Sequence, residues 1–297
     1  MDLQLGVVTP VVNLNPRFDP PRWELDGGIE EVVAVAKAAE AAGYGWLSCS
    51  EHVAIPALVA ATRGGRYWDP LATLSFVAAR TQSIRLLTYV LVLGYHHPLE
   101  VVKRYGTLDV ASGGRVVLGV GVGTLRPEFD LLGVPYAARG ERADDAMRAI
   151  RASFGRRAPS YSGPHYAFAD MIVDPCGLER PVTMWVGGRT RRSLRRALEL
   201  GDGWIPFGLE LPALRALLDE PALAEQRRGK PGFDVVLAPE PPLDPAGHPE
   251  ACADAVRAYA AAGSTALNVR FVHRSLAHYL EQLEALAMLV RRLEPSD

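Results

Sequence analysis

Short apolar runs alternate with longer amphipathic segments along most of the chain. The short runs are rich in valine and leucine and end at glycine, proline or polar residues, which is typical of strands buried in a parallel sheet. The runs that we interpret as strands are residues 3–9, 46–53, 85–93, 116–123, 183–188, 202–207, 234–238 and 266–272.

The amphipathic segments carry apolar residues at helical spacing. Asp69 followed by Pro70 is a strong helix start, and Ser275 is the expected cap of the last helix. The segments that we expect to be helices are residues 27–42, 69–82, 98–112, 139–154, 190–200, 211–226, 249–262 and the stretch that follows Ser275.

This alternation predicts an α/β fold, a (β/α)8 TIM barrel formed by a single domain over residues 1–297. An open, doubly wound sheet is the structural alternative. Residues 155–181 are expected to be an insertion after the fourth helix that wraps over the body. In such a barrel the active site lies at the carboxyl ends of the strands, so candidate residues are sought there.

Composition narrows the class of protein. With 48% hydrophobic residues and a formal net charge of -2, the chain shows no sign of a nucleic-acid-binding surface. No apolar run is long enough to span a membrane, and the N-terminus does not have the pattern of a secretory signal. The three cysteines lie far apart without a CxxC motif, which favours free thiols in a reducing cytoplasm.

The fourth predicted strand has glycine at alternate positions, Gly119, Gly121 and Gly123. Glycine weakens a strand, so a packed helix, a neighbouring turn or a ligand is expected to approach the backbone closely there. A second glycine-rich strand end, Gly187-Gly188-Arg189, precedes a predicted helix. Backbone N–H groups, a helix N-terminus and an arginine favour a phosphate. A tight turn packed against a helix is the alternative for each loop.

Glu51 and His52 end the second predicted strand. A carboxylate beside an imidazole suits acid–base catalysis or the lining of a cofactor site, and a hydrogen-bonded structural histidine is the alternative. His96 and His97 precede a predicted helix and favour a solvated or capping role. The sequence patterns of Schiff-base, metal-dependent and serine-hydrolase barrels are missing at the strand ends. No metal site is predicted, and a cofactor that carries the chemistry is favoured.

Several segments together resemble the bacterial luciferase-like monooxygenase superfamily. They are SEHVAIP (50–56), WDPLATLSFVAARTQSIRLLTYVLVLGYHHP (68–98), ASGGRVVLGVGVGTLRPEFDLLGVPYAARGER (111–142) and WVGGRTRRSLRRALELGDGW (185–204). The combination is most similar to the branch that uses the deazaflavin coenzyme F-420. The resemblance implies a luciferase-like barrel with the coenzyme ring at the carboxyl ends of the strands, and a homodimer.

The resemblance also implies a set of site residues. His52, with Glu51 beside it, would face the ring and the substrate, and a non-prolyl cis peptide at Tyr89-Val90 would lie behind the ring. The positions that match coenzyme-binding residues are Thr88, Tyr89, Val90, Gly121, Val122, Gly123, Thr124, Gly187, Gly188 and Arg189. Some sugar-phosphate dehydrogenases of this branch carry an acidic proton donor where Thr124 stands, so that activity is not implied here.

Our leading hypothesis is an oxidoreductase that transfers hydride between coenzyme F-420 and a small organic substrate, with residues 155–181 as a cover over the mouth. The alternatives are an FMN-dependent monooxygenase and a non-catalytic binder of a phosphorylated ligand or flavin. The arginines that suit the acidic tail of the deazaflavin, with ordinary helix-surface positions as the alternative, are Arg126, Arg189, Arg191 and Arg192.

Overall fold

Eight parallel strands close a barrel in this computed structural model, which describes residues 3–293. The barrel strands are β1 (Gln4–Val8), β2 (Trp46–Cys49), β3 (Arg85–Thr88), β5 (Val116–Gly121), β8 (Thr183–Gly187), β9 (Gly203–Ile205), β10 (Asp234–Leu237) and β11 (Ala266–Val269). They are hydrogen-bonded in the order β3-β2-β1-β11-β10-β9-β8-β5, and pairing of β5 with β3 closes the ring. The predicted TIM barrel is confirmed, and the open sheet is wrong.

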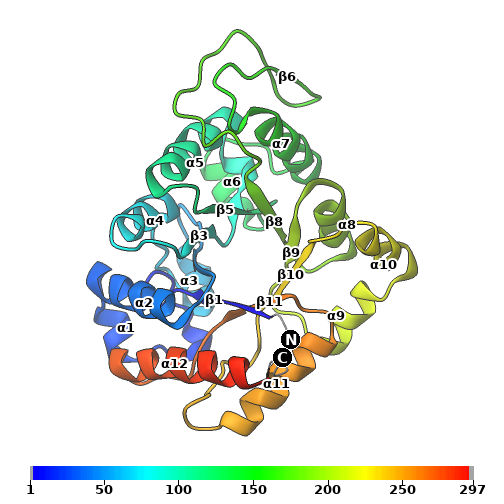
Figure 1. Cartoon of the computed structure of the whole chain (residues 1–297). Helices are drawn as coiled ribbons and strands as arrows, with labels where there is room; N and C mark the ends of the chain where they lie inside the picture. Colours follow the sequence, from blue (N-terminus) through cyan, green and yellow to red (C-terminus); the bar gives the residue numbers. More distant parts are fainter. Residues whose placement is uncertain (1–2, 294–297) are drawn as a thin grey trace.

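Helices surround the ring of strands, as Figure 1 shows. They are α1 (Arg22–Asp26), α2 (Ile29–Ala42), α3 (Ala57–Arg63), α4 (Pro70–Ala78), α5 (Pro98–Ser112), α6 (Arg126–Leu131), α7 (Arg139–Ser153), α8 (Arg191–Leu200), α9 (Leu211–Leu218), α10 (Pro221–Arg228), α11 (Pro249–Ala261) and α12 (Leu276–Leu293), with short 3-10 turns η1 (Pro16–Phe18) and η2 (Leu93–Tyr95). None of the helices within residues 3–293 has the combination of length and apolar character needed to cross a membrane.

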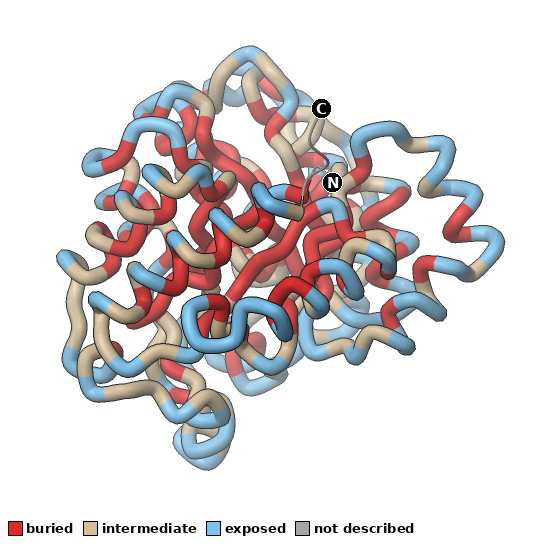
Figure 2. The backbone as a smooth tube through the Cα atoms, turned by 60° about the horizontal axis from the view of Figure 1, so that its bottom comes forward, coloured by how far each residue is buried: buried red, intermediate tan, exposed pale blue. Residues whose placement is uncertain are grey.

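Apolar side chains fill the barrel and also cover its outside. Inside, the rings of Trp46 and Trp185 meet edge to face with their centroids 5.0 Å apart. Gly6 leaves room for the Trp46 indole, because a Cβ at Gly6 would lie 1.9 Å from that ring. The opposite faces of the strands pack against the helices, so the strands run through the buried centre of the molecule (Figure 2). Burial on both faces explains the near-continuous apolar runs.

The second and third strands are shorter than predicted. β2 ends at Cys49, so Glu51 and His52 lie in the loop beyond it. β3 ends at Thr88, where the predicted cis peptide bond joins Tyr89 to Val90, and the short strand β4 (Leu91–Val92) then continues beside β5. The non-prolyl cis peptide implied by the resemblance is therefore present, and it forms a bulge between β3 and β4.

The predicted helix at residues 211–226 is two helices, α9 and α10. Glu220 has extended backbone, with φ −56° and ψ 121°, because the ring of Pro221 disfavours helical backbone in the residue before it. Pro221 then begins α10 at a position where its missing N–H costs no hydrogen bond. The helices α3 and α6 lie in loops after barrel strands and are too short to show a helical period in the sequence.

Residues 155–181 form the predicted insertion, with a hairpin of β6 (Tyr161–Ser162) and β7 (Ala167–Phe168). Asp145 of α7 accepts a hydrogen bond from the Tyr161 hydroxyl at 2.5 Å, and Asp109 of α5 pairs with Arg180 at 3.0 Å. Figure 1 shows the insertion beyond α5 and α7, at the outer edge of the molecule. These contacts attach it to the outer helices, which corrects the expectation that it covers the mouth.

Candidate active site

Protein packing explains the alternate glycines of β5 and of the loop that follows it. Cβ atoms at Gly119, Gly121 and Gly123 would lie 1.9, 2.6 and 2.7 Å from their nearest neighbours. Those neighbours belong to the Thr88 carbonyl, the Val90 side chain, the Phe129 ring and Val92. The close approach that the sequence predicts is thus made by the bulged third strand and by α6. The space left by these glycines is filled by protein, so any ligand must bind the exposed edges of the loop.

The bulge residues have distinct surroundings. Thr88 is fully buried and its hydroxyl donates to the Gly119 carbonyl at 2.8 Å, which places its side chain in the barrel wall. Val90 packs between Gly121 of β5 and Gly187 of β8, where an added Cβ would lie 2.6 or 2.8 Å from its methyl groups. Val90 therefore forms an apolar surface beside both glycine loops.

Tyr89, by contrast, lies near β11. Burial raises the pKa of its phenol to about 12, while the nearby Arg270 charge and the Asn268 side chain act in the opposite direction. The two residues of the cis peptide thus connect opposite sides of the ring, because β11 is four positions from β5 in the strand order.

The two glycine loops lie side by side, since Val120 of β5 pairs with Val186 of β8. Residues 121–124 therefore neighbour residues 187–189. Gly188 has a φ of +115°, and a Cβ there would lie 2.8 Å from the Ser193 Cβ, so the turn into α8 requires glycine. The side chains of Thr124 and Arg189 are exposed, and Arg189 directly precedes Thr190, the N-cap of α8. This set of donors suits an oxyanion such as a phosphate.

The four candidate arginines differ in their partners. Arg191 pairs with Glu220 at 2.5 Å, and Arg126 pairs with Asp130 at 3.6 Å. Arg189 and Arg192 form no ion pair with the residues between 3 and 293 that the structure describes. Of the four candidates, these two therefore keep an unpaired positive charge near the glycine loops, where Arg139 also donates to the Gly123 carbonyl at 3.0 Å.

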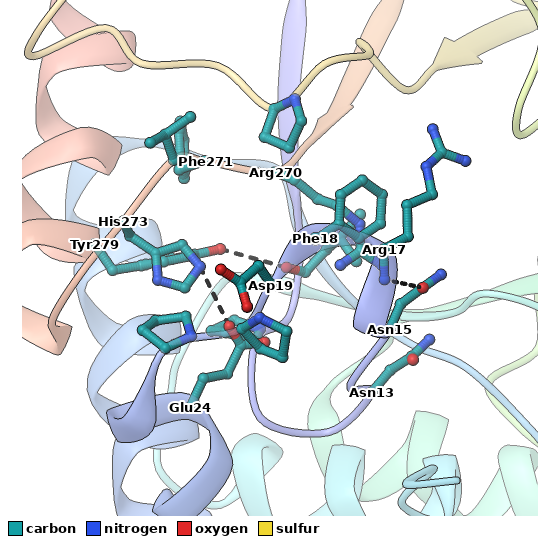
Figure 3. A pocket seen from close by; sticks show the side chains of 16 residues that line it. Asn13, Asn15, Arg17, Phe18, Asp19, Glu24, Arg270, Phe271, His273 and Tyr279 are labelled. Carbon is teal, nitrogen blue, oxygen red and sulfur yellow. Dashed lines mark hydrogen bonds and ion pairs between the residues drawn. The ribbon is translucent and has the colours of Figure 1, made fainter. Parts of the chain in front are cut away.

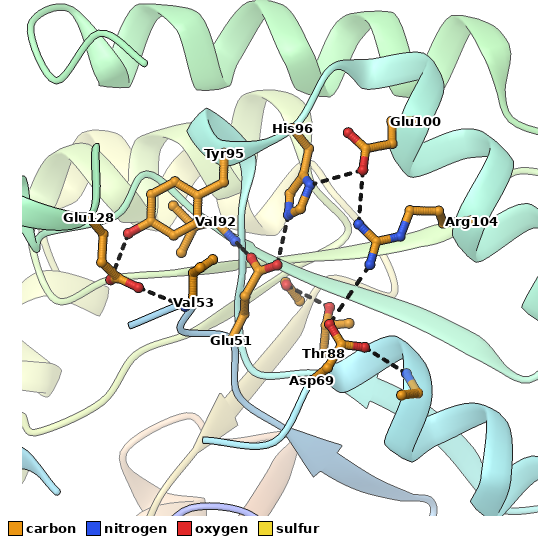
Figure 4. A network of polar contacts seen from close by, with 12 residues as sticks. Glu51, Val53, Asp69, Thr88, Val92, Tyr95, His96, Glu100, Arg104 and Glu128 are labelled. Carbon is orange, nitrogen blue, oxygen red and sulfur yellow. Dashed lines mark hydrogen bonds and ion pairs between the residues drawn. The ribbon is translucent and has the colours of Figure 1, made fainter. Parts of the chain in front are cut away.

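Glu51 is buried and both its carboxylate oxygens are occupied (Figure 4). One accepts the Val92 N–H at 2.6 Å, and the other accepts from His96 Nε2 at 2.7 Å. His96 is therefore not the solvated group that the sequence suggested. His97 is a cap as predicted, since its Nδ1 accepts the Leu99 N–H at 3.2 Å. These contacts make Glu51 a clamp that holds β4 against the end of β2.

His52 pairs with a different carboxylate, that of Glu128 at the start of α6. The His52 Nδ1 to Glu128 Oε2 distance is 2.6 Å, and the His52 ring packs edge to face on Tyr67 at 4.5 Å. The Glu128 side chain is 1% exposed, whereas that of His52 is 17% exposed. Because Nδ1 donates to the carboxylate, Nε2 is the nitrogen left to exchange a proton at the mouth.

The Glu128 carboxylate accepts hydrogen bonds from four donors outside its own helix. It accepts from the Tyr95 hydroxyl at 2.8 Å and from the Val53 and Ala54 N–H groups at 2.8 and 3.2 Å, in addition to His52. Burial raises the Glu128 pKa, but these hydrogen bonds and the His52 charge outweigh it, so the pKa is lowered. The carboxylate therefore stays ionised and fixes the imidazole. The motif PEFDLLG contained this residue, but nothing local in it linked Glu128 to His52.

A cavity of about 410 Å³ opens at the carboxyl ends of β1 and β11 (Figure 3). Its walls combine apolar rings, including Phe18 and Phe271, with the charged side chains of Arg270 and Glu24. In the sequence, Arg270 is distinguished only by its position in the last predicted strand, residues 266–272. Many of the other lining residues come from the loop after β1, whose sequence matches no motif.

The fold and these contacts define a TIM barrel with its polar groups gathered at the carboxyl ends of the strands, beside two loops that suit a phosphate. The sequence pattern of the luciferase-like monooxygenase family matches residues 4–244. The chain belongs to this family, as the resemblance implied.

Known proteins similar to the chain use different coenzymes. An uncharacterised protein of Mycobacterium tuberculosis is 29% identical over 210 residues, 67% of this chain and 72% of that protein. The FMNH2-dependent dimethylsulfone monooxygenase of Pseudomonas putida is 26% identical over 146 residues, 48% of this chain and 40% of the enzyme. The coenzyme F-420-dependent tetrahydromethanopterin reductase of Methanopyrus kandleri superposes with a TM-score of 0.75 at 14% identity, covering 99% of this chain and all 100% of that one.

Proposed function

We propose that the chain is an oxidoreductase that transfers hydride between the deazaflavin coenzyme F-420 and a small organic substrate. The observation that carries the proposal is that a fixed imidazole, His52, and the paired loops 121–124 and 187–189 lie at the same end of a luciferase-like barrel. A family of redox enzymes, an oxyanion-binding set of donors and one proton-transfer group together suit hydride chemistry.

The residues of the mouth fit such a coenzyme. Thr124, Arg189 and the N-terminus of α8 would hold its phosphate, and Val90 would provide an apolar surface for its ring. When bound, the coenzyme supplies a hydride donor or acceptor. The loops and Val90 would hold it against the substrate in contact close enough for transfer. Arg189 and Arg192, which lack a protein carboxylate among the described residues, would suit the acidic tail.

His52 supplies the proton chemistry of this proposal. Its Nδ1 is held by Glu128, so its Nε2 would donate a proton to a substrate oxygen on reduction, or accept one on oxidation. Thr124 cannot take that role because a hydroxyl is a poor acid. Glu51 was an equal candidate in the sequence, but both its oxygens are committed to Val92 and His96.

Coenzyme binding tests the proposal directly. F-420 and FMN are titrated separately into the wild-type protein, and tighter binding of F-420 is expected. Arg189→Met should weaken F-420 binding about tenfold, the effect of one charge-assisted hydrogen bond. Arg126→Met is the matched control, because Arg126 is exposed and already paired with Asp130. Tighter binding of FMN by the wild type would contradict the proposal.

An FMN-dependent monooxygenase is the second candidate, and the similarity to the dimethylsulfone monooxygenase favours it. The same phosphate loops would serve FMN. Oxygen uptake distinguishes the two functions: consumption that depends on both reduced FMN and the protein, beyond the spontaneous oxidation of FMN, supports the monooxygenase. Oxidation of reduced F-420 by an organic substrate without oxygen supports the hydride-transfer enzyme.

A further inference from the structure

We propose that the cavity between β1 and β11 binds the oxyanion of the substrate, and that Arg270 is the residue that recognises it. The identification of this ligand as the substrate rests on the proposed function. The substrate would be a small organic acid whose apolar part lies against Phe18 and Phe271.

Arg270 carries a positive charge that no protein group neutralises by direct contact. Its guanidinium carbon lies 4.8 Å from the centre of the Phe18 ring, and among residues 3–293 no carboxylate comes within ion-pair distance of it. Arginine presents several N–H donors in a planar fork that matches a carboxylate or phosphate, and a buried donor without an acceptor costs stability. A partly buried guanidinium facing a cavity therefore favours an anionic ligand.

Of the other charged side chains that line the cavity, Glu24, His273 and Arg17 are already paired, and Asp19 has no ion pair among the described residues. Glu24 accepts the Val11 N–H at 3.3 Å through one oxygen and lies 3.2 Å from His273 Nε2 through the other. His273 Nδ1 in turn accepts from Trp23 Nε1 at 3.1 Å, which places the histidine proton on Nε2, toward Glu24.

Arg17 also lies over the Phe18 ring, and it is paired with Glu240. Asp19 is exposed at the rim. Among the described residues, Arg270 is therefore the cation lining the cavity that has no carboxylate partner and is available to a ligand.

The position of the cavity separates it from the coenzyme loops. In the strand order, the junction of β1 and β11 lies across the ring from the junction of β5 and β8. Tyr89 extends toward Arg270, and Val90 packs beside the glycine loops, so the cis peptide lies between the two sites. A coenzyme bound at the loops with its ring over Val90 would leave the cavity for the substrate.

The cavity is connected to the proton-transfer group through Asn13. This residue lines the cavity and pairs with Tyr67 across an isolated β-bridge, and the ring of Tyr67 packs on His52 at 4.5 Å. In the proposal, an oxyanion at Arg270 would leave the rest of a small substrate on the side of the cavity that leads to His52. A volume of about 410 Å³ is in the range of small-molecule sites.

The test compares probes that differ in charge. Phenylacetate, benzylphosphonate and the neutral phenylacetamide are titrated calorimetrically into the full-length protein and its Arg270→Met and Arg270→Lys variants. We expect the wild type to prefer at least one of the two acids over the amide by tenfold or more, and the preferred acid distinguishes a carboxylate from a phosphate substrate. Arg270→Met should abolish the preference, and Arg270→Lys should retain part of it. Arg22→Met is the matched control, because Arg22 is exposed and pairs with Asp26 outside the cavity.

Equal binding of acids and amide by the wild type, or an unchanged preference in Arg270→Met, would overturn the proposal. Titration of F-420 into the same variants separates it from the proposed function. Unchanged F-420 affinity in Arg270→Met supports a substrate site, whereas a tenfold loss would assign Arg270 to the coenzyme tail and overturn the inference. A protein that binds neither coenzyme but keeps the Arg270-dependent preference would contradict the proposed function and support the oxyanion site.

Discussion

Glu51 with His96 and Glu128 with His52 are two carboxylate–imidazole pairs at the end of β2, with N···O distances of 2.7 and 2.6 Å. They differ in what the second ring nitrogen meets. His96 Nδ1 faces Glu100 at 3.6 Å, so carboxylates lie at both of its nitrogens. Among residues 3–293, His52 has a carboxylate at Nδ1 and none at Nε2, which stays available at the mouth.

The difference shows how one type of contact serves two purposes. Burial lowers the pKa of His96, but Glu51 and Glu100 outweigh it and raise the pKa above its ordinary value. A histidine with carboxylates at both nitrogens keeps its proton and serves as a structural contact. A histidine oriented by one carboxylate and open on the other side can exchange a proton with a ligand. We therefore expect changes at His52 to affect turnover, and changes at the Glu51–His96 pair to affect stability.

Removal of the His52 imidazole should have the largest effect. His52→Ala should lower kcat by about 10²- to 10⁴-fold, the usual contribution of a general acid or base, with any substrate that the wild type turns over. Steady-state kinetics measure the change, and circular dichroism confirms folding. His248→Ala is the control, because the His248 side chain is 76% exposed and pairs with Asp244, away from the mouth residues. Full turnover by His52→Ala would show that His52 is not the proton donor.

Loss of the Glu128 charge should act on turnover through His52. Glu128→Gln keeps an acceptor oxygen for the backbone N–H groups but no longer holds the imidazole as an ion pair. We expect kcat to fall about tenfold to a hundredfold, the effect found for partners that orient the histidines of metal sites. The ¹⁵N shifts of the His52 ring should change with it, which a merely structural role would not require. Tyr95→Phe removes one of the other donors to Glu128 and should have a smaller effect; equal losses in both variants would contradict the positioning role.

The sequence predicted the barrel well but not these pairs. Strand and helix periods are local, so the eight strands, the cap at Ser275 and the cap at His97 followed from neighbouring residues. The adjacency of Glu51 and His52 suggested one functional pair. Both residues lie in the loop after β2, where Glu51 contacts His96 and His52 contacts Glu128.

The partners that sequence reasoning missed come from distant segments. Glu128 is 76 positions from His52 along the chain, and α6 is too short to predict from its own period. The glycines of β5 were correctly expected to admit a close neighbour. The neighbour is Val90, Phe129 or a backbone carbonyl, and only the three-dimensional arrangement could distinguish these from a ligand.

Loss of the Glu51 charge should reduce stability. Glu51→Gln weakens the buried contact to His96 and alters the bond from the Val92 N–H, so the free energy of unfolding should fall by about 1–3 kcal/mol. Urea denaturation measures it. Glu100→Gln is the matched control on the same imidazole: its side chain is 47% exposed, and a change within about 0.5 kcal/mol is expected. A larger loss in Glu100→Gln than in Glu51→Gln would mean that the buried pair is not the clamp.

The smallest effect is a difference in pH dependence between the two pairs. The folded-state pKa of His96 is raised above its ordinary value of 6.5, so the stability due to its charge is fully present below about pH 6.5 and is lost as the pH rises through the raised pKa. The pKa of Glu128 is lowered below its ordinary 4.5. Its contribution is present above about pH 4.5 and is lost as the pH falls through the lowered pKa.

Urea denaturation of wild type, His96→Asn and Glu128→Gln at a series of pH values separates these contributions. The stability difference between wild type and His96→Asn should shrink on the alkaline side of the His96 pKa, and that between wild type and Glu128→Gln on the acid side of the Glu128 pKa. If both differences shrank in the same direction, the two pairs would share one electrostatic role. The proposed difference, in which His96 keeps its proton and Glu128 stays ionised to orient His52, would then be wrong.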